Sequence, residues 1–159
     1  KGSRCPSFIE FHRATLLTSG WVYSVPTLEF RWQLPYRYDE YGRYGPFLGV
    51  GLAVNGHHFD MLCLVDTGAE RTLLDGQHLR IAGVDIYTGK PVKVGGFLGP
   101  SLVVYEHAVH LVVQEVEISM RILFAAQPLE RVVLGRDFLG EFRFGLREGA
   151  SELFLGDED

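Results

Sequence analysis

The chain has 159 residues, enough for one domain or for one domain with an extension, and 47% of them are hydrophobic, which supports a buried core. A formal net charge of -5 provides no basic surface for nucleic acid, so nucleic-acid binding is disfavoured. No apolar run reaches the roughly 18 residues of a membrane-spanning helix. No secretory signal pattern is evident either, so we expect no membrane partner and a cytoplasmic location, with a leader removed before Lys1 left open.

The first 45 residues differ from the rest. Four apolar residues alternate with polar ones and predict a strand with one apolar face: Leu28, Phe30, Trp32 and Leu34. A stretch rich in Tyr and Gly, residues 35–46, follows it. We interpret residues 1–45 as an N-terminal extension, a strand plus a linker, that precedes a main domain over residues 46–159. The extension either packs on the core sheet or docks a partner.

The main domain is predicted to be all-β. Nineteen glycines, 11 Phe and 7 Tyr favour turns and strands over helices. Asn55-Gly56, between two apolar runs, is the strongest hairpin signal in the chain. One short helix is predicted over residues 136–142, where Phe138, Leu139 and Phe142 share a face. The predicted strands are 47–54, 58–65, 72–74, 90–94, 102–105, 108–113, 116–126, 142–146 and 152–155.

An acidic residue stands at the end of one of these strands. Asp66-Thr67-Gly68-Ala69-Glu70 follows the apolar run from Met61 to Val65. Moving a carboxylate from water into an apolar setting costs roughly several kcal/mol of free energy, unless the group is hydrogen-bonded or protonated there. Such a placement indicates a carboxyl group with a chemical role.

The residues around Asp66 resemble the active-site loop of the retropepsin-like aspartic proteases. The ten residues from Leu64 to Leu73 match the Asp-Thr-Gly-Ala loop of that family. A second segment, from Val132 to Leu139, resembles the apolar-apolar-Gly-Arg-Asp/Asn segment that closes the same fold. The resemblance covers roughly residues 47–156 and is closer to cellular and prokaryotic single-domain members than to viral enzymes. It implies a closed, barrel-like all-β domain with a flap hairpin and one short C-terminal helix.

The resemblance also implies a mechanism. Aspartic proteases use two carboxyl groups that share one proton, and this chain carries one Asp-Thr-Gly. We therefore expect a homodimer in which each subunit contributes Asp66, Thr67 bonds across the two-fold axis, and Gly68 permits close backbone approach. Peptides or proteins are the expected substrates, and no metal or other cofactor is required. Ala69 offers no hydroxyl to the dyad, which predicts a mildly acidic to neutral working pH.

Other residues receive roles through the same resemblance. Glu70 is expected to pair with Arg136, and Asp137 to be structural. Gly95-Gly96-Phe97-Leu98 resembles the flap, with an ordinary glycine hairpin as the alternative. Arg71 either faces the cleft or lies on the surface. The residues expected to bind substrate are Ala69, Glu70, Arg71, Gly95, Gly96, Phe97, Leu98, Arg131 and Val133. We predict no metal site at His57-His58, because adjacent strand residues point to opposite faces.

The C-terminal strand pair, residues 142–155, resembles the hairpin that builds the dimer interface in cellular relatives. Its apolar side chains are therefore expected to be buried by a second subunit: Phe142, Phe144, Leu153 and Phe154. Two alternatives stay open. One is a binding or dimerisation module that keeps the fold without cutting. The other is a latent enzyme that removes its own first 45 residues by a cut between Tyr36 and Tyr44, which would make the extension a propeptide.

Overall fold

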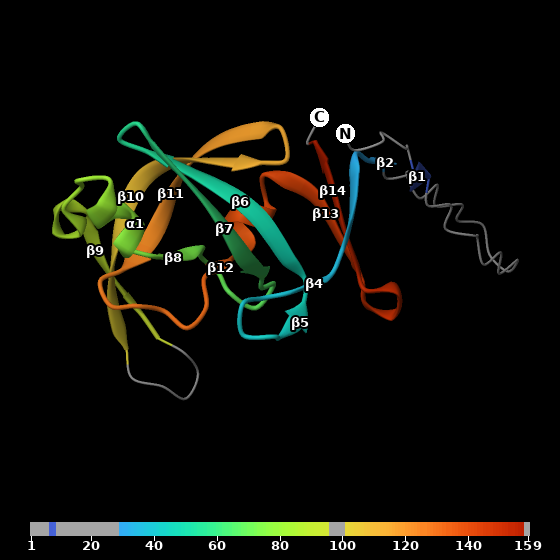
Figure 1. Ribbon diagram of the computed structural model, residues 1–159, viewed down its shortest axis with the longest axis horizontal. Coiled ribbons are helices and arrows are strands. Elements are labelled where there is room, and N and C mark those ends of the chain that lie inside the picture. The colour runs from blue at the N-terminus through green and yellow to red at the C-terminus, as the bar shows by residue number, and fades with distance from the viewer. Residues whose placement is uncertain (1–6, 9–28, 96–100, 158–159) are drawn as a thin grey trace, which may run out of the picture.

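The computed structural model describes residues 7–8, 29–95 and 101–157 (Figure 1). These residues form mainly strands, with two short α-helices, α1 (Gln77–Ile81) and α2 (Arg136–Leu139), and two 3-10 turns, η1 (Ile86–Thr88) and η2 (Glu148–Ala150). The strands are β1 (Ser7–Phe8), β2 (Glu29–Phe30), β3 (Trp32–Pro35), β4 (Arg37–Tyr38), β5 (Tyr44–Gly45), β6 (Phe47–Val54), β7 (His57–Val65), β8 (Leu73–Asp75), β9 (Lys90–Val94), β10 (Leu102–Val113), β11 (Val116–Ala125), β12 (Val133–Leu134), β13 (Phe142–Arg147) and β14 (Glu152–Asp157). The predicted all-β fold is confirmed.

Six of the described strands close into a barrel. Their order is β11-β8-β12-β7-β6-β10, and β10 also pairs with β11, which completes the ring. Alternation along β6 shows how the sequence fills it: Leu48, Val50 and Leu52 are buried, whereas Gly49 is exposed and Gly51 half-buried. Strand β9 pairs with β10 at the edge of the ring and extends away from it (Figure 1).

The hairpin between β6 and β7 forms where the sequence predicts it. Asn55 and Gly56 both have positive φ angles, 47° and 78°, as a two-residue hairpin turn of the favoured hand requires. Val54 pairs with His57 across this turn. The two strands then run antiparallel until β7 ends at Val65, directly before Asp66.

Three local predictions need correction. No helix was predicted after the strand at 72–74, where the structure has the five-residue helix α1, which is too short to give a helical period in the sequence. The two strands predicted at 102–105 and 108–113 are one 12-residue strand, β10, because β9, β11 and β6 together supply ladder partners along its length. Helix α2 ends at Leu139 rather than at residue 142, since Phe142 is already part of strand β13 and pairs with Asp157 of β14.

The alternating N-terminal segment joins the C-terminal hairpin. Strand β3 pairs with β14, so that β13, β14 and β3 form a three-stranded sheet beside the barrel (Figure 1). Trp32 and Leu34 are half-buried while Gln33 is exposed, as the alternation predicts. The stretch interpreted as a linker contains the small hairpin β4–β5. Its loop is closed by the Asp39 carboxylate, which accepts from the Tyr41 and Arg43 N–H groups at 3.0 and 2.8 Å.

The apolar side chains of the C-terminal hairpin are largely buried within the subunit. Phe142, Leu153 and Phe154 are 4%, 1% and 3% exposed, and the Phe154 ring lies 5.4 Å from that of Phe30. The expectation that a second subunit buries these three side chains is therefore wrong, because the barrel and the N-terminal strands already cover them. A charged substitution at Phe154 would therefore disrupt the packing of the subunit itself.

Candidate active site

Asp66 leaves the barrel at the end of β7. Strand β12 lies between β7 and β8, parallel to the former and antiparallel to the latter. The Asp66 N–H donates to the Leu134 carbonyl at 3.0 Å, so the backbone of this residue is held by β12. The sequence prediction of an acid at a strand end is correct, and the side chain is half-buried there.

The Asp66 side chain is oriented by its own loop. The Oδ1 atom of Asp66 accepts a hydrogen bond from the Gly68 N–H at 2.9 Å, and the backbone carbonyl of Asp66 accepts one from the Ala69 N–H at 3.1 Å. A Cβ atom at Gly68 would lie only 3.1 Å from that Oδ1, which favours glycine here. Thr67 and Gly68 are exposed at the turn. The loop thus presents a carboxyl group whose orientation is set by a backbone N–H.

The loop is attached to the start of helix α2. The Arg136 N–H donates to the Ala69 carbonyl at 2.9 Å, and the Asp137 N–H donates to the Glu70 carbonyl at 3.2 Å. Gly135 permits this approach, since a Cβ atom there would lie 2.5 Å from the backbone carbon of Arg71. The two sequence motifs, 64–73 and 132–139, therefore lie against each other.

A buried hydroxyl and a carboxylate complete the attachment. Thr72 is fully buried; its hydroxyl accepts from the Gly135 N–H at 3.1 Å and donates to Asp137 Oδ1 at 2.8 Å. The same oxygen accepts from the backbone N–H groups of Thr72 and Phe138, at 2.7 and 2.8 Å. Sequence reasoning gave Thr72 no role, because its partner lies 65 residues away.

The predicted Glu70–Arg136 ion pair is absent from the described residues. Both side chains are exposed, and Glu70 and Arg136 take part in the attachment through their backbone atoms alone. An exposed pair of this kind would contribute little, since solvent screens it. Arg71 forms the ion pairs at this place instead.

Arg71 is held by two carboxylates. Its Nη2 atom lies 2.7 Å from Glu106 Oε1 on β10, and its Nε atom lies 3.2 Å from Asp137 Oδ2. The hydrogen bond from Arg71 holds the pKa of Glu106 below its usual range, against the opposing effect of burial. Glu106 is a site residue that sequence reasoning missed, because no motif marks a partner 35 residues away.

The remaining predicted substrate-binding residues are only partly described. Gly95 is exposed at the end of β9, and Gly96, Phe97 and Leu98 lie outside the described residues. Strands β9 and β10 on either side run antiparallel, with Val94 opposite Leu102. Arg131 is exposed before β12, and Val133 is half-buried within it. Their roles in binding stay predictions.

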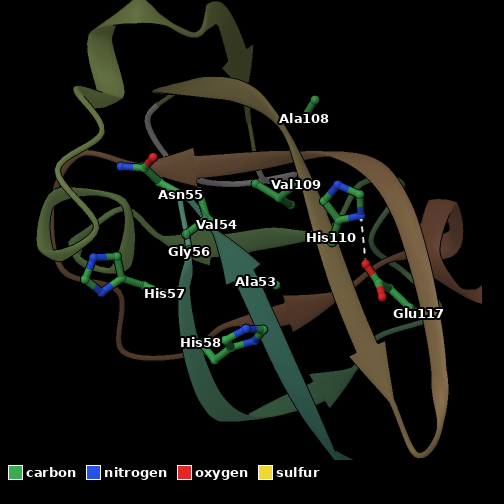
Figure 2. Close-up of a pocket in the computed structure, with 10 residues that line it drawn as sticks. All are labelled: Ala53, Val54, Asn55, Gly56, His57, His58, Ala108, Val109, His110 and Glu117. Atoms are coloured by element: carbon green, nitrogen blue, oxygen red, sulfur yellow. Dashed lines mark ion pairs between the residues drawn. The ribbon is translucent and has the colours of Figure 1, made fainter.

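A hollow of about 220 Å³ lies at the opposite end of β7 from Asp66 (Figure 2). In it, His110 Nδ1 lies 3.1 Å from Glu117 Oε1, and both side chains are more than half exposed. No cluster of three or more metal-ligating side chains is arranged for an ion in the described parts of the chain. The residues lining the hollow are Ala53, Val54, Asn55, Gly56, His57, His58, Ala108, Val109, His110 and Glu117. None of them belongs to the two motifs, so we assign the site to the Asp66 loop on chemical grounds.

Comparison with known proteins identifies the family. The family model of the gag-polyprotein putative aspartyl protease matches residues 50–141, more than half of the chain, and the protein therefore belongs to this retropepsin-like aspartic protease family. The crystal structure of a retropepsin-like aspartic protease from Rickettsia conorii superposes with a TM-score of 0.57 at 17% identity, covering 77% of this chain and 89% of that one. At this identity the likeness shows the fold alone.

Two further solved structures are similar to smaller degrees. EIAV protease, complexed with the inhibitor HBY-793, has a TM-score of 0.46 and 25% identity over 60% of this chain and 86% of its own. The retroviral protease-like domain of Ddi1 from Leishmania major has a TM-score of 0.44 and 14% identity over 71% and 94%. No curated protein matches the chain. Within the described residues, no helix is long and apolar enough to cross a bilayer.

Proposed function

We propose that the protein is an aspartic endopeptidase that acts on peptide bonds as a homodimer. The observation that carries the proposal is the Asp66 loop: in a chain of this family, an intact Asp-Thr-Gly presents a carboxyl group oriented by the Gly68 N–H at 2.9 Å. The loop is fixed to helix α2 by backbone hydrogen bonds on both Ala69 and Glu70. Such preorganisation is what positioned acid–base chemistry requires.

The mechanism needs two copies of Asp66. One carboxylate takes a proton from the attacking water, while the other, protonated, donates a hydrogen bond to the carbonyl of the scissile peptide. Because the sequence holds a single Asp-Thr-Gly, a two-fold axis beside Asp66 would supply the second carboxyl group. Thr67 is exposed at the turn, which suits a side chain that bonds across this axis. No metal or cofactor is needed for these steps.

The substrate would lie between the Asp66 loop and the β9–β10 hairpin. In this proposal Ala69, Gly95 and Val133 border the bound peptide, together with the hairpin tip, and Arg131 contributes a charge that we expect to affect specificity. Glu70 and Arg71 flank the same loop. Arg71 is engaged by Glu106 and Asp137, so its charge is balanced before any substrate arrives.

The domain boundary at residue 46 and the cytoplasmic location remain predictions. Self-removal of the first 45 residues would require the β4–β5 hairpin to open, because a protease binds an extended segment. Tyr36 is 8% exposed and donates its hydroxyl to Glu148 at 2.8 Å, while Arg43 pairs with Asp39 at 2.6 Å. We therefore expect no early cut between Tyr36 and Tyr44 in the folded protein.

The test compares the wild type with Asp66→Asn on a diverse peptide mixture from pH 4 to pH 8, read by mass spectrometry, with sedimentation to establish the dimer. We expect cleavage by the wild type and a loss of about a hundredfold to ten-thousandfold in the variant, as removal of an acid–base group produces. Asp60→Asn, the same change at an exposed residue of β7, is the matched control and should cut normally.

Two outcomes would reject the proposal. Equal cleavage by wild type and Asp66→Asn would show that another group does the chemistry. A dimeric wild type that cuts nothing across this pH range would instead favour the second candidate, a peptide-binding or dimerisation module that keeps the fold without activity.

A further inference from the structure

We propose that Glu106 is a positioning residue: through Arg71 it ties strand β10 to the loop that follows Asp66. The tie is a property of the fold, and only its kinetic consequence rests on the proposed protease function. Glu106 belongs to neither of the two sequence motifs. Its role follows from where the folded chain places it.

The contacts of Arg71 join three separate segments. Its Nη2 atom donates to Glu106 Oε1 on β10 at 2.7 Å and to the Arg121 carbonyl on β11 at 3.2 Å. Its Nε atom donates to Asp137 Oδ2 on α2 at 3.2 Å. The guanidinium is a rigid fork that makes several hydrogen bonds at once, so holding one end of it fixes the others. Arg71 thus connects the active-site loop to elements on two sides.

Burial separates this pair from an ordinary surface ion pair. The side chain of Glu106 is 11% exposed, that of Asp137 is 19% exposed and that of Arg71 is 33% exposed. Charged hydrogen bonds that are partly removed from water are stronger than solvated ones. Arg121 also approaches Glu106, at 3.5 Å, and Lys90 lies opposite Glu106 on β9, so the charge of Arg71 is met by two carboxylates within a cluster of charged groups. We therefore expect Arg71 to give no preference for acidic substrate side chains.

The same stretch of β10 is also held from its other side. The carbonyl of Ile86 in η1 lies 2.8 Å from the ring Nε2 atom of His107. Gly89 packs so closely that a Cβ atom there would lie 2.8 Å from the Glu106 carbonyl. Residues 106 and 107 are therefore an anchored point of β10, and Glu106 is the side chain through which that point reaches the active-site loop.

The experiment uses Glu106→Gln, which keeps the shape and removes the charge, with Glu117→Gln as the control on the same β10–β11 hairpin. Hydrogen exchange of β9 and of residues 102–106 is measured in each protein. We expect Glu106→Gln to speed exchange there by about tenfold, the factor that corresponds to one charge-assisted hydrogen bond, and Glu117→Gln to leave it unchanged. With a peptide that the wild type cleaves, KM should rise several-fold, roughly, while kcat changes less.

Glu106→Asp retains the charge with a shorter reach and should recover part of the protection. Should Glu106→Gln not fold, this variant decides: faster exchange confined to β9 and residues 102–106 supports the tie, and a uniform change along the chain overturns it. Glu106→Gln that behaves like Glu117→Gln in exchange also overturns it. A wild type without activity would reject the proposed function, while the exchange result would still decide the role of Glu106.

Discussion

The two ends of strand β7 differ in how they are built. At one end, Asp66 enters a loop that is held by backbone hydrogen bonds, a fully buried Thr72 and ion pairs. At the other end, roughly 25 Å away for eight residues of extended chain, His58 borders a hollow with an exposed His110–Glu117 pair. The hollow offers space, whereas the Asp66 end offers fixed groups.

This difference shows why the shape of one subunit is a poor guide to its chemistry. In the homodimer proposed above, the site would be completed by a second copy and would be only half-formed in one chain, so it need not be hollow. Its mark is instead a dense set of hydrogen bonds that orients a few side chains in advance. Variants at the two ends should therefore have effects of very different size.

The largest effect is expected for Gly135→Ala at the ordered end. The new Cβ atom would lie 2.5–2.9 Å from the backbone atoms of Arg71, and backbone cannot move aside without breaking the loop. We expect a loss of about 3 kcal/mol or more of unfolding free energy, measured by urea unfolding. Gly49→Ala, where nothing lies within 4 Å, is the control and should be close to neutral. A Gly135→Ala protein as stable as the wild type would show that close packing of Gly135 does not hold the Asp66 end of β7.

A smaller effect is expected from acid at the same end. Arg71 lowers the pKa of Glu106 in the folded protein, so the unfolded chain binds a proton at Glu106 more readily than the folded one does. The ionised carboxylate therefore stabilises the fold at pH values above the ordinary pKa of a glutamate. The stability advantage of wild type over Glu106→Gln should be constant from pH 6 to pH 8. It should shrink as the pH falls below about 4.3, the ordinary value for a glutamate. An advantage independent of pH down to full protonation would contradict this assignment.

The smallest effect is expected at the hollow. His110→Ala removes one partner of an exposed ion pair, and such pairs contribute less than about 1 kcal/mol. We expect a change within about 0.5 kcal/mol in thermal unfolding and an unchanged cleavage rate. If His110→Ala abolished cleavage, the hollow would have to take part in the function.

Much of the fold was predictable from local patterns. Apolar runs that end at glycine-containing turns predicted β6 and β9 with their observed bounds, and Asn55-Gly56 predicted the first of these turns, because such signals act over a few residues. Helix α1 escaped prediction since five residues contain little more than one turn. The β4–β5 hairpin read as a linker, because its loop depends on the Asp39 carboxylate rather than on a standard turn pair.

The site was predictable to the extent that it is contiguous in sequence. Asp66 and its turn follow from one motif and the resemblance it carries. The groups that hold the loop, Thr72, Asp137 and Glu106, act across 35 to 66 residues, and no periodicity reports such pairing. The expected Glu70–Arg136 pair failed for the same reason: only the folded backbone decides which of two adjacent charged residues turns inward, and here Arg71 and Asp137 pair instead.

The pairing of β3 with β14 brings the start of the range 29–95 close to the end of the range 101–157. Gly156 lies so close to β2 that a Cβ atom there would be 2.8 Å from the Glu29 carbonyl. A short peptide joining residue 157 to residue 29 would therefore close the chain into a ring with little strain, and a new opening at the exposed η2 turn would leave every strand of the barrel continuous. A permuted chain of this kind would have its termini beside the Tyr36–Glu148 hydrogen bond and would leave the Asp66 loop unaltered.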